Sequence, residues 1–154
     1  MQWSESIETY IRNKRNECDN ISLMHEAEAD RNHNINKILT YSGISISFIM
    51  ALFQIPSIVL EEEQTNLWNY LTLSAFAIQT LIATIIQTGN FSDKKDLNLA
   101  SSLDFEIMKT NITQQLAIDS SNRRQSEEYQ KYIDDLFIKA SRYRPYVSKK
   151  SRKK

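Results

Sequence analysis

Two long apolar blocks stand out in the pattern of hydrophobic and polar positions along the chain. No charged residue occurs from Ile38 to Leu60, a run of 23 positions, or from Leu67 to Thr88, a run of 22. As α-helices these blocks would reach roughly 34 and 33 Å, which matches a hydrocarbon core of about 30 Å. Apolar side chains surround the whole first block, whereas a surface helix keeps a polar stripe. The pattern therefore predicts two transmembrane helices rather than two core helices of a soluble bundle.

The charges that flank the blocks predict their orientation. The connector at residues 61–66 carries three glutamates and no Lys or Arg, whereas Lys37 precedes the first block and Lys94 and Lys95 follow the second. By the positive-inside rule, both termini lie on the cytosolic side, or its topological equivalent, and the acidic turn lies opposite. We expect no signal peptide, because residues 1–30 are charged throughout.

The segments outside the two blocks have the pattern of amphipathic helices. The first has apolar residues mostly three, four or seven positions apart, namely Trp3, Ile7, Ile11, Cys18, Ile21, Met24 and Ala27. Beyond the second block a looser stripe comprises Leu97, Leu103, Ile107, Ile112, Leu116 and Ile118. A break is expected at residues 119–122, followed by a stripe of Tyr129, Tyr132, Ile133, Leu136, Phe137 and Ala140 that Pro145 ends. These antiparallel neighbours are expected to pack on each other or on copies in an oligomer.

The predicted fold is an all-α membrane protein, in which amphipathic helices precede and follow a two-helix transmembrane hairpin on the same side. The expected parts are an amphipathic helix at 1–37, transmembrane helices at 38–60 and 67–88, an acidic outer turn at 61–66, an amphipathic helical segment at 89–141 and a basic tail at 142–154.

The formal net charge of zero conceals a basic end. Residues 93–154 carry fourteen basic and nine acidic side chains, and from Lys139 onward there are eight basic residues and no acid. Three roles remain open for this tail: a solvated terminus that enforces orientation, a clamp on anionic lipid headgroups, or a contact with an acidic protein or nucleic acid. The candidate docking residues are Arg142, Tyr143, Arg144, Tyr146, Lys149, Lys150, Arg152, Lys153 and Lys154.

The sequence contains no enzyme signature, and we expect no catalytic residue, metal site or cofactor. Two glycines make a phosphate-binding loop a poor candidate, and the single cysteine, Cys18, excludes an internal disulfide framework and is expected to be a packed, reduced thiol. His25 and His33 lie eight residues apart, roughly 12 Å along a helix, which is too far for one metal ion. They are expected on a solvated acidic helix face.

Polar and small residues inside the blocks predict helix contacts. Gly43, Ser47 and Ala51 are spaced four apart and form a ridge that permits close helix approach, and Pro56 predicts a kink near the outer end of the first helix. Gln79 lies near the bilayer centre, where an unpaired amide is costly. Hydrogen bonds between packed helices and a water-lined pore of glutamine rings in an oligomer remain alternatives. The candidate packing or pore-lining residues are Gly43, Ser47, Ala51, Gln54, Gln79, Ala83 and Gln87.

A family resemblance rests on the run from Met24 to Asn34, MHEAEADRNHN, and on the order of the segments after it. A Ser/Ile-rich span, a very short turn, a second span and a charged helical segment come next. This order resembles the SLATT-type two-transmembrane family, which is found with bacterial nucleotide-signalling conflict systems and in large DNA viruses. The similarity covers roughly residues 20–140 and excludes the basic tail. It implies a membrane effector that assembles into pores.

Two functions therefore compete. The first is a small oligomeric integral membrane protein that acts as a pore-forming effector. The alternative is a structural virion or envelope membrane protein, which anchors a bilayer to a protein or nucleic-acid layer through its basic tail. The expected partners are the bilayer, further copies of the chain, and anionic headgroups or an acidic surface. Ion flux separates the two, because an anchor requires none.

Overall fold

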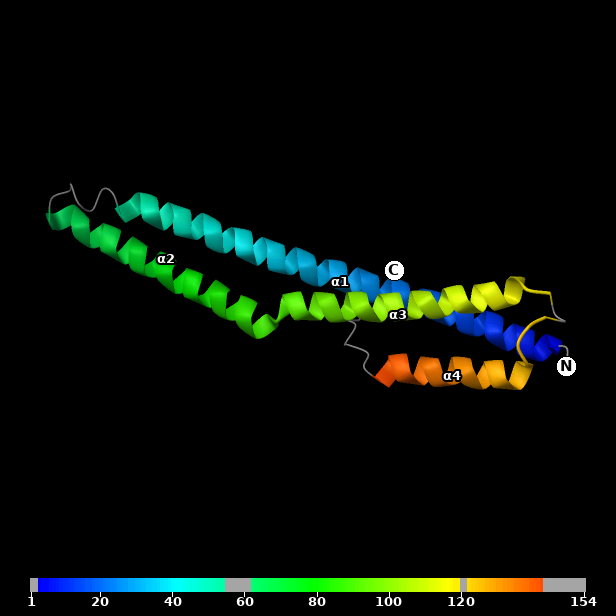
Figure 1. Cartoon of the computed structure of the whole chain (residues 1–154). Coiled ribbons are helices and arrows are strands. Elements are labelled where there is room, and N and C mark those ends of the chain that lie inside the picture. Colours follow the sequence, from blue (N-terminus) through cyan, green and yellow to red (C-terminus); the bar gives the residue numbers. More distant parts are fainter. Residues whose placement is uncertain (1–2, 55–61, 120–121, 143–154) are drawn as a thin grey trace. The chain divides into compact units, whose positions relative to one another are not determined.

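The computed structural model describes residues 3–54, 62–119 and 122–142, without the side chains at 53–54, 62–66 and 142. Within these ranges the chain forms four α-helices: α1 (Glu5–Gln54), α2 (Glu62–Gly89), α3 (Phe91–Ala117) and α4 (Ser126–Arg142) (Figure 1). The described residues contain no strand, so the all-helical prediction is confirmed for them. They divide into unit 1, residues 3–31 and 94–142, and unit 2, residues 32–93.

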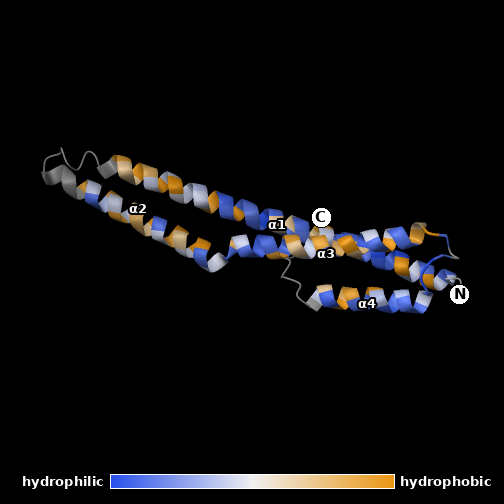
Figure 2. Ribbon diagram, in the orientation of Figure 1, coloured by the Kyte–Doolittle hydropathy of each residue, from blue (hydrophilic) through white to orange (hydrophobic). Residues whose placement is uncertain are grey.

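Two helical stretches are long and apolar enough to cross a membrane. They lie within Glu5–Leu52 and Leu67–Ala117, and the apolar window of each contains no buried residue. Figure 2 shows hydrophobic residues concentrated on α2 and on the later part of α1. The prediction of two segments with the length and composition of membrane spans is therefore confirmed. Pro56, with its predicted kink, lies outside the described residues.

Local sequence explains where the helices begin and end. Ser4 precedes α1, and its Oγ accepts a hydrogen bond from the backbone N–H of Ile7 at 3.4 Å, as an N-terminal cap does. Glu5 and Glu8 occupy the first turn, where negative charge stabilises the helix dipole. The break expected at residues 119–122 falls between α3 and α4.

The junction between α2 and α3 contains a glycine in close contact with an aromatic ring. Asn90 has a φ of 46°, a left-handed conformation that asparagine tolerates better than most residues. A Cβ atom added at Gly89 would lie 2.2 Å from Cε2 of the Phe91 ring, far inside van der Waals contact. A side chain at position 89 would therefore require the Phe91 ring or the backbone to move.

Unit 1 is a bundle of the first part of α1 with α3 and α4. Its core contains two clusters to which all three helices contribute, and in the first of them the Trp3 ring stacks on Tyr129 with centroids 5.5 Å apart. The first cluster comprises Trp3, Ile11, Ile112, Tyr129 and Ile133. The second comprises Cys18, Ile21, Phe105 and Met108, flanked by Leu136, Phe137 and Ala140. The predicted stripes on the first and last inner helices thus supply most of this core.

The stripe predicted for α3 is wrong in most of its positions. Leu97, Leu103 and Ile107 are 56%, 51% and 59% exposed. The residues that α3 buries are Asn98, Ser102, Phe105, Met108 and Ile112. Two of these are polar, and a search for apolar residues could not select them because their burial depends on hydrogen bonds to α1.

Candidate functional site: polar contacts in the two units

In unit 2, α1 and α2 pack as antiparallel neighbours. A Cβ built on Gly43 lies 3.8 Å from Cγ2 of Ile82, and Ser47 contacts Gln79, so residue numbers rise on one helix as they fall on the other. The half-buried residues of α2 recur at alternating spacings of three and four, namely Trp68, Thr72, Ala75, Gln79, Ile82, Ile86 and Gly89. This spacing is typical of knobs-into-holes packing between two helices.

A short chain of hydrogen bonds links the two helices at the middle of the second apolar block. Nε2 of Gln79 donates to Oγ of Ser47 at 2.6 Å, and the Ser47 hydroxyl donates to the carbonyl oxygen of Gly43 at 2.9 Å. One amide N–H of Gln79 is thereby satisfied. Its side-chain carbonyl oxygen and its second N–H form no hydrogen bond with any other described residue. The described residues of one chain therefore satisfy the Gln79 amide only in part.

The described serine and threonine hydroxyls of α2, in contrast, need no outside partner. Each donates to the backbone carbonyl oxygen four residues earlier, at distances from 2.7 to 2.9 Å. The donors are Thr72, Ser74, Thr80, Thr84 and Thr88. The Gln79 amide differs from these hydroxyls, because the group that it reaches lies on the neighbouring helix.

The structure brings only part of the predicted packing set together. Gly43 and Gln79 are half-buried between α1 and α2, and Ser47 joins them although much of its surface is exposed. The remaining residues with described side chains, Ala51, Ala83 and Gln87, are exposed. Gln54 is the last residue of α1, and its side chain lies outside the described atoms.

Unit 1 contains a buried polar layer between α1 and α3. Oγ of Ser22 lies 3.0 Å from Oγ of Ser102 and 3.1 Å from its carbonyl oxygen. Nδ1 of His25 lies 2.8 Å from Oδ1 of Asn98, whose Nδ2 donates to the carbonyl oxygen of Lys94. Because Asn98 uses its nitrogen as that donor, its oxygen accepts from His25, which assigns a proton to Nδ1.

The predicted placement of His25 is therefore wrong. His25 is fully buried and stacks on Phe105, with ring centroids 6.1 Å apart. His33 is exposed, as expected for a solvated helix face. His25 lies seven residues after Cys18 and four after Ile21, so the heptad spacing of α1 places it on the buried side. That spacing was the available sequence signal.

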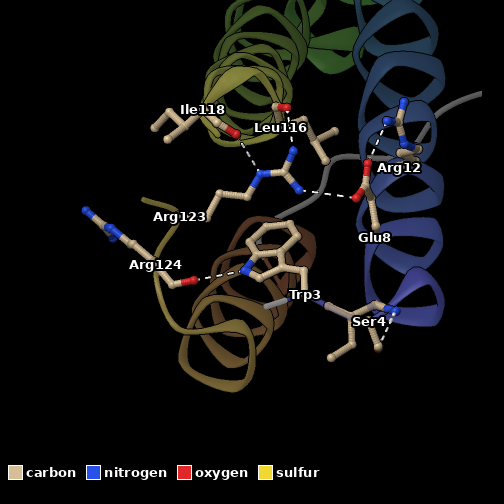
Figure 3. A network of polar contacts seen from close by, with 9 residues as sticks. Trp3, Ser4, Glu8, Arg12, Leu116, Ile118, Arg123 and Arg124 are labelled. Atoms are coloured by element: carbon tan, nitrogen blue, oxygen red, sulfur yellow. Dashed lines mark hydrogen bonds and ion pairs between the residues drawn. The ribbon is translucent and has the colours of Figure 1, made fainter. Parts of the chain in front are cut away.

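Arg123 closes the opposite end of unit 1, a role that the sequence pattern did not predict (Figure 3). Its guanidinium donates to the carbonyl oxygens of Leu116 and Ile118 at 2.9 and 2.8 Å, at the C-terminal end of α3. It also pairs with Glu8 at 3.2 Å, and hydrogen bonds from Arg12 and Arg123 lower the pKa of Glu8. A cation at this position satisfies carbonyls that a helix end leaves unpaired and complements the helix dipole.

The described residues contain no group of three or more His, Cys, Asp or Glu side chains that could hold a metal ion. Cys18 is buried, and burial raises the pKa of its thiol to about 11, which keeps it protonated at neutral pH. Of the predicted docking residues, Arg142 ends α4 without a described side chain. Those that lie outside the described residues are Tyr143, Arg144, Tyr146, Lys149, Lys150, Arg152, Lys153 and Lys154.

Comparison of the chain with protein-family models, with curated proteins and with solved structures found no match.

Proposed function

We propose that this chain is a two-span integral membrane protein, in which α1 and α2 cross the bilayer and both termini lie on the cytosolic or topologically equivalent side. Exposed apolar side chains on both helices support the proposal, since Phe48, Leu73 and Leu81 are 66%, 66% and 61% exposed. In water a continuous apolar surface of this kind is unfavourable, whereas in lipid it is the required surface. The charge asymmetry around the two blocks supports the orientation.

Within that bilayer the chain assembles into a homo-oligomer that acts as a pore-forming effector. The partly satisfied amide of Gln79, near the middle of the second span, supports this role. Leaving an amide group without a hydrogen-bond partner in hydrocarbon costs on the order of several kcal/mol. Contact of the Gln79 amide with another copy or with pore water is therefore favoured. The resemblance to the SLATT-type family agrees with this proposal. No catalytic activity is part of it.

Ion flux from liposomes that contain the purified full chain tests the pore. We expect flux with the wild type and a reduced flux with Gln79→Leu, which removes the polar group from mid-span. Ser74→Ala is the matched control on the same helix, because the Ser74 hydroxyl is already satisfied by the carbonyl oxygen of Tyr70 at 2.8 Å. Absence of flux from a correctly inserted wild-type protein contradicts the pore.

A structural anchor is the second candidate, favoured by the eight basic residues among the last sixteen. In this role the tail binds an acidic protein or nucleic-acid layer while the two spans hold the bilayer. The anchor is favoured over the pore if an acidic protein or nucleic acid co-sediments with the wild type but not with a variant that lacks residues 143–154. Neither protein should then conduct ions.

A further inference from the structure

A groove runs between α3 and α4 on the surface of unit 1. Its volume is about 300 Å³, and Met108 and Leu136 contribute its more buried apolar lining. Ile107 and Tyr132 line it while remaining 59% and 41% exposed. The described residues that line it are Ser101, Asp104, Ile107, Met108, Asn111, Tyr132, Leu136, Lys139 and Ala140.

The groove carries one acid and one base, on opposite walls. Tyr129 hydrogen-bonds to the carbonyl oxygen of Asn111 and Phe137 contacts Phe105, so α3 and α4 run antiparallel. Asp104 on α3 and Lys139 on α4 consequently lie at about the same level. Neither forms an ion pair with another described residue. The groove, lined by both polar and apolar side chains, thus carries two charges of opposite sign that form no ion pair with another described residue.

We propose that this groove is a contact surface between two copies of the chain, related by a two-fold axis that passes between Asp104 and Lys139. The axis brings Asp104 of each copy against Lys139 of the other, and it brings the exposed Ile107 side chains into the shared apolar region. An isologous contact requires such a self-complementary surface. The proposal deepens the homo-oligomer of the proposed function and rests on it for the presence of a second copy.

The charge pattern favours a second copy over other occupants. An anionic lipid surface or a nucleic acid is bound by a surface with excess positive charge, whereas the two charges of this groove cancel. A partner that matches both charges and the apolar lining must present a base opposite Asp104 and an acid opposite Lys139. The same groove, rotated by half a turn, presents that arrangement.

Charge reversal in the full chain tests the contact. Copies are labelled with a donor or an acceptor dye at Thr9→Cys, an exposed position, in a Cys18→Ser background. Energy transfer between copies is measured in liposomes at increasing ratios of lipid to protein. We expect Asp104→Lys and Lys139→Asp each to weaken self-association by about tenfold, because each creates like-charge contacts at both ends of the pair. A mixture of the two variants should associate within about twofold of the wild type, since every contact is again between opposite charges.

The mixture also controls for misfolding, because two damaged proteins would not restore each other. Ile107→Asp should weaken association as well, whereas Ile138→Asp should not, since Ile138 is 57% exposed on α4 and does not line the groove. The proposal is overturned if both single reversals self-associate as strongly as the wild type. It is also overturned if the mixture associates as weakly as each variant does alone. Ion flux is measured separately. If the single reversals associate like the wild type and still conduct ions, the groove contact is refuted and the pore is retained. If the mixture restores association but the wild type conducts no ions, the pore is refuted and the groove contact is retained.

Discussion

The hydroxyl of Tyr10 donates a hydrogen bond to Oδ1 of Asp134 at 2.5 Å, which ties α1 to α4 across 124 positions of sequence. Tyr10→Phe removes this donor and leaves the partly buried carboxylate of Asp134 without its hydrogen bond from α1. We therefore expect the free energy of unfolding to fall by about 1 kcal/mol. Chemical denaturation in detergent, followed by circular dichroism, measures this loss. In a cycle with Asp134→Asn, additive effects of the two substitutions would contradict a direct coupling.

Unit 1 should lose stability as the pH rises above 9. Burial, and then the hydrogen bond to Asp134, raises the pKa of Tyr10 from 10 to about 12, and burial raises the pKa of Cys18 from 9 to about 11. At a pH between the unfolded and the folded pKa of either group, the unfolded chain has released a proton that the folded chain still holds. Alkaline pH therefore favours unfolding. This contribution is complete below pH 9 and is lost through pH 11 to 12.

The measurement is the denaturation midpoint between about pH 8 and pH 12, a range that includes the unfolded and the folded pKa values of both groups. Cys18→Ala removes one of the groups and should flatten the decline, whereas Thr9→Ala, at an exposed position on the same helix, should leave it unchanged. A midpoint that is constant over this range, or that rises with pH, would show that the folded state does not hold these protons more tightly.

Apolar and polar positions differed in how well the sequence predicted them, for a physical reason. Long uncharged blocks and heptad spacing are local signals, and they predicted the span-like helices and the core residues Ile11 and Ile133. The burial of Asn98 depends on its hydrogen bond to His25, 73 positions away, which no local pattern contains. Arg123 is similar, since its role depends on where α3 ends and on Glu8.

The turn after α2 should tolerate change at Asn90 better than at Gly89. Gly89→Ala places a Cβ 2.2 Å from the Phe91 ring and forces that ring or the backbone to move. We expect a loss of about 1–3 kcal/mol, the usual cost of overpacking, and partial rescue by Phe91→Ala. Asn90→Gly should be neutral or slightly stabilising, because glycine adopts a φ of 46° without strain. Unfolding in detergent measures all three, and a wild-type value for Gly89→Ala would contradict the close contact.

Cysteine labelling tests the proposed orientation. In a Cys18→Ser background, an impermeant maleimide added to intact cells should modify Thr65→Cys, at the start of α2, and miss Thr110→Cys on α3. Thr110 is exposed in unit 1, so its protection would reflect the membrane rather than burial. Permeabilised cells supply the control, in which both positions react. The reverse labelling pattern would place the termini on the opposite side.

The basic tail should bind anionic bilayers through charge. A peptide of residues 139–154 carries eight basic side chains and no acid, and each basic residue near an anionic leaflet contributes about 1 kcal/mol. We expect binding to vesicles that contain phosphatidylserine, no measurable binding to neutral vesicles, and an affinity that falls steeply as salt rises. A peptide with Arg142, Arg144, Lys149 and Lys150 replaced by Gln is the matched control and should bind much more weakly. Equal, salt-independent binding of both peptides to both kinds of vesicle would exclude an electrostatic role. Binding to nucleic acid but not to anionic lipid would instead favour the structural anchor.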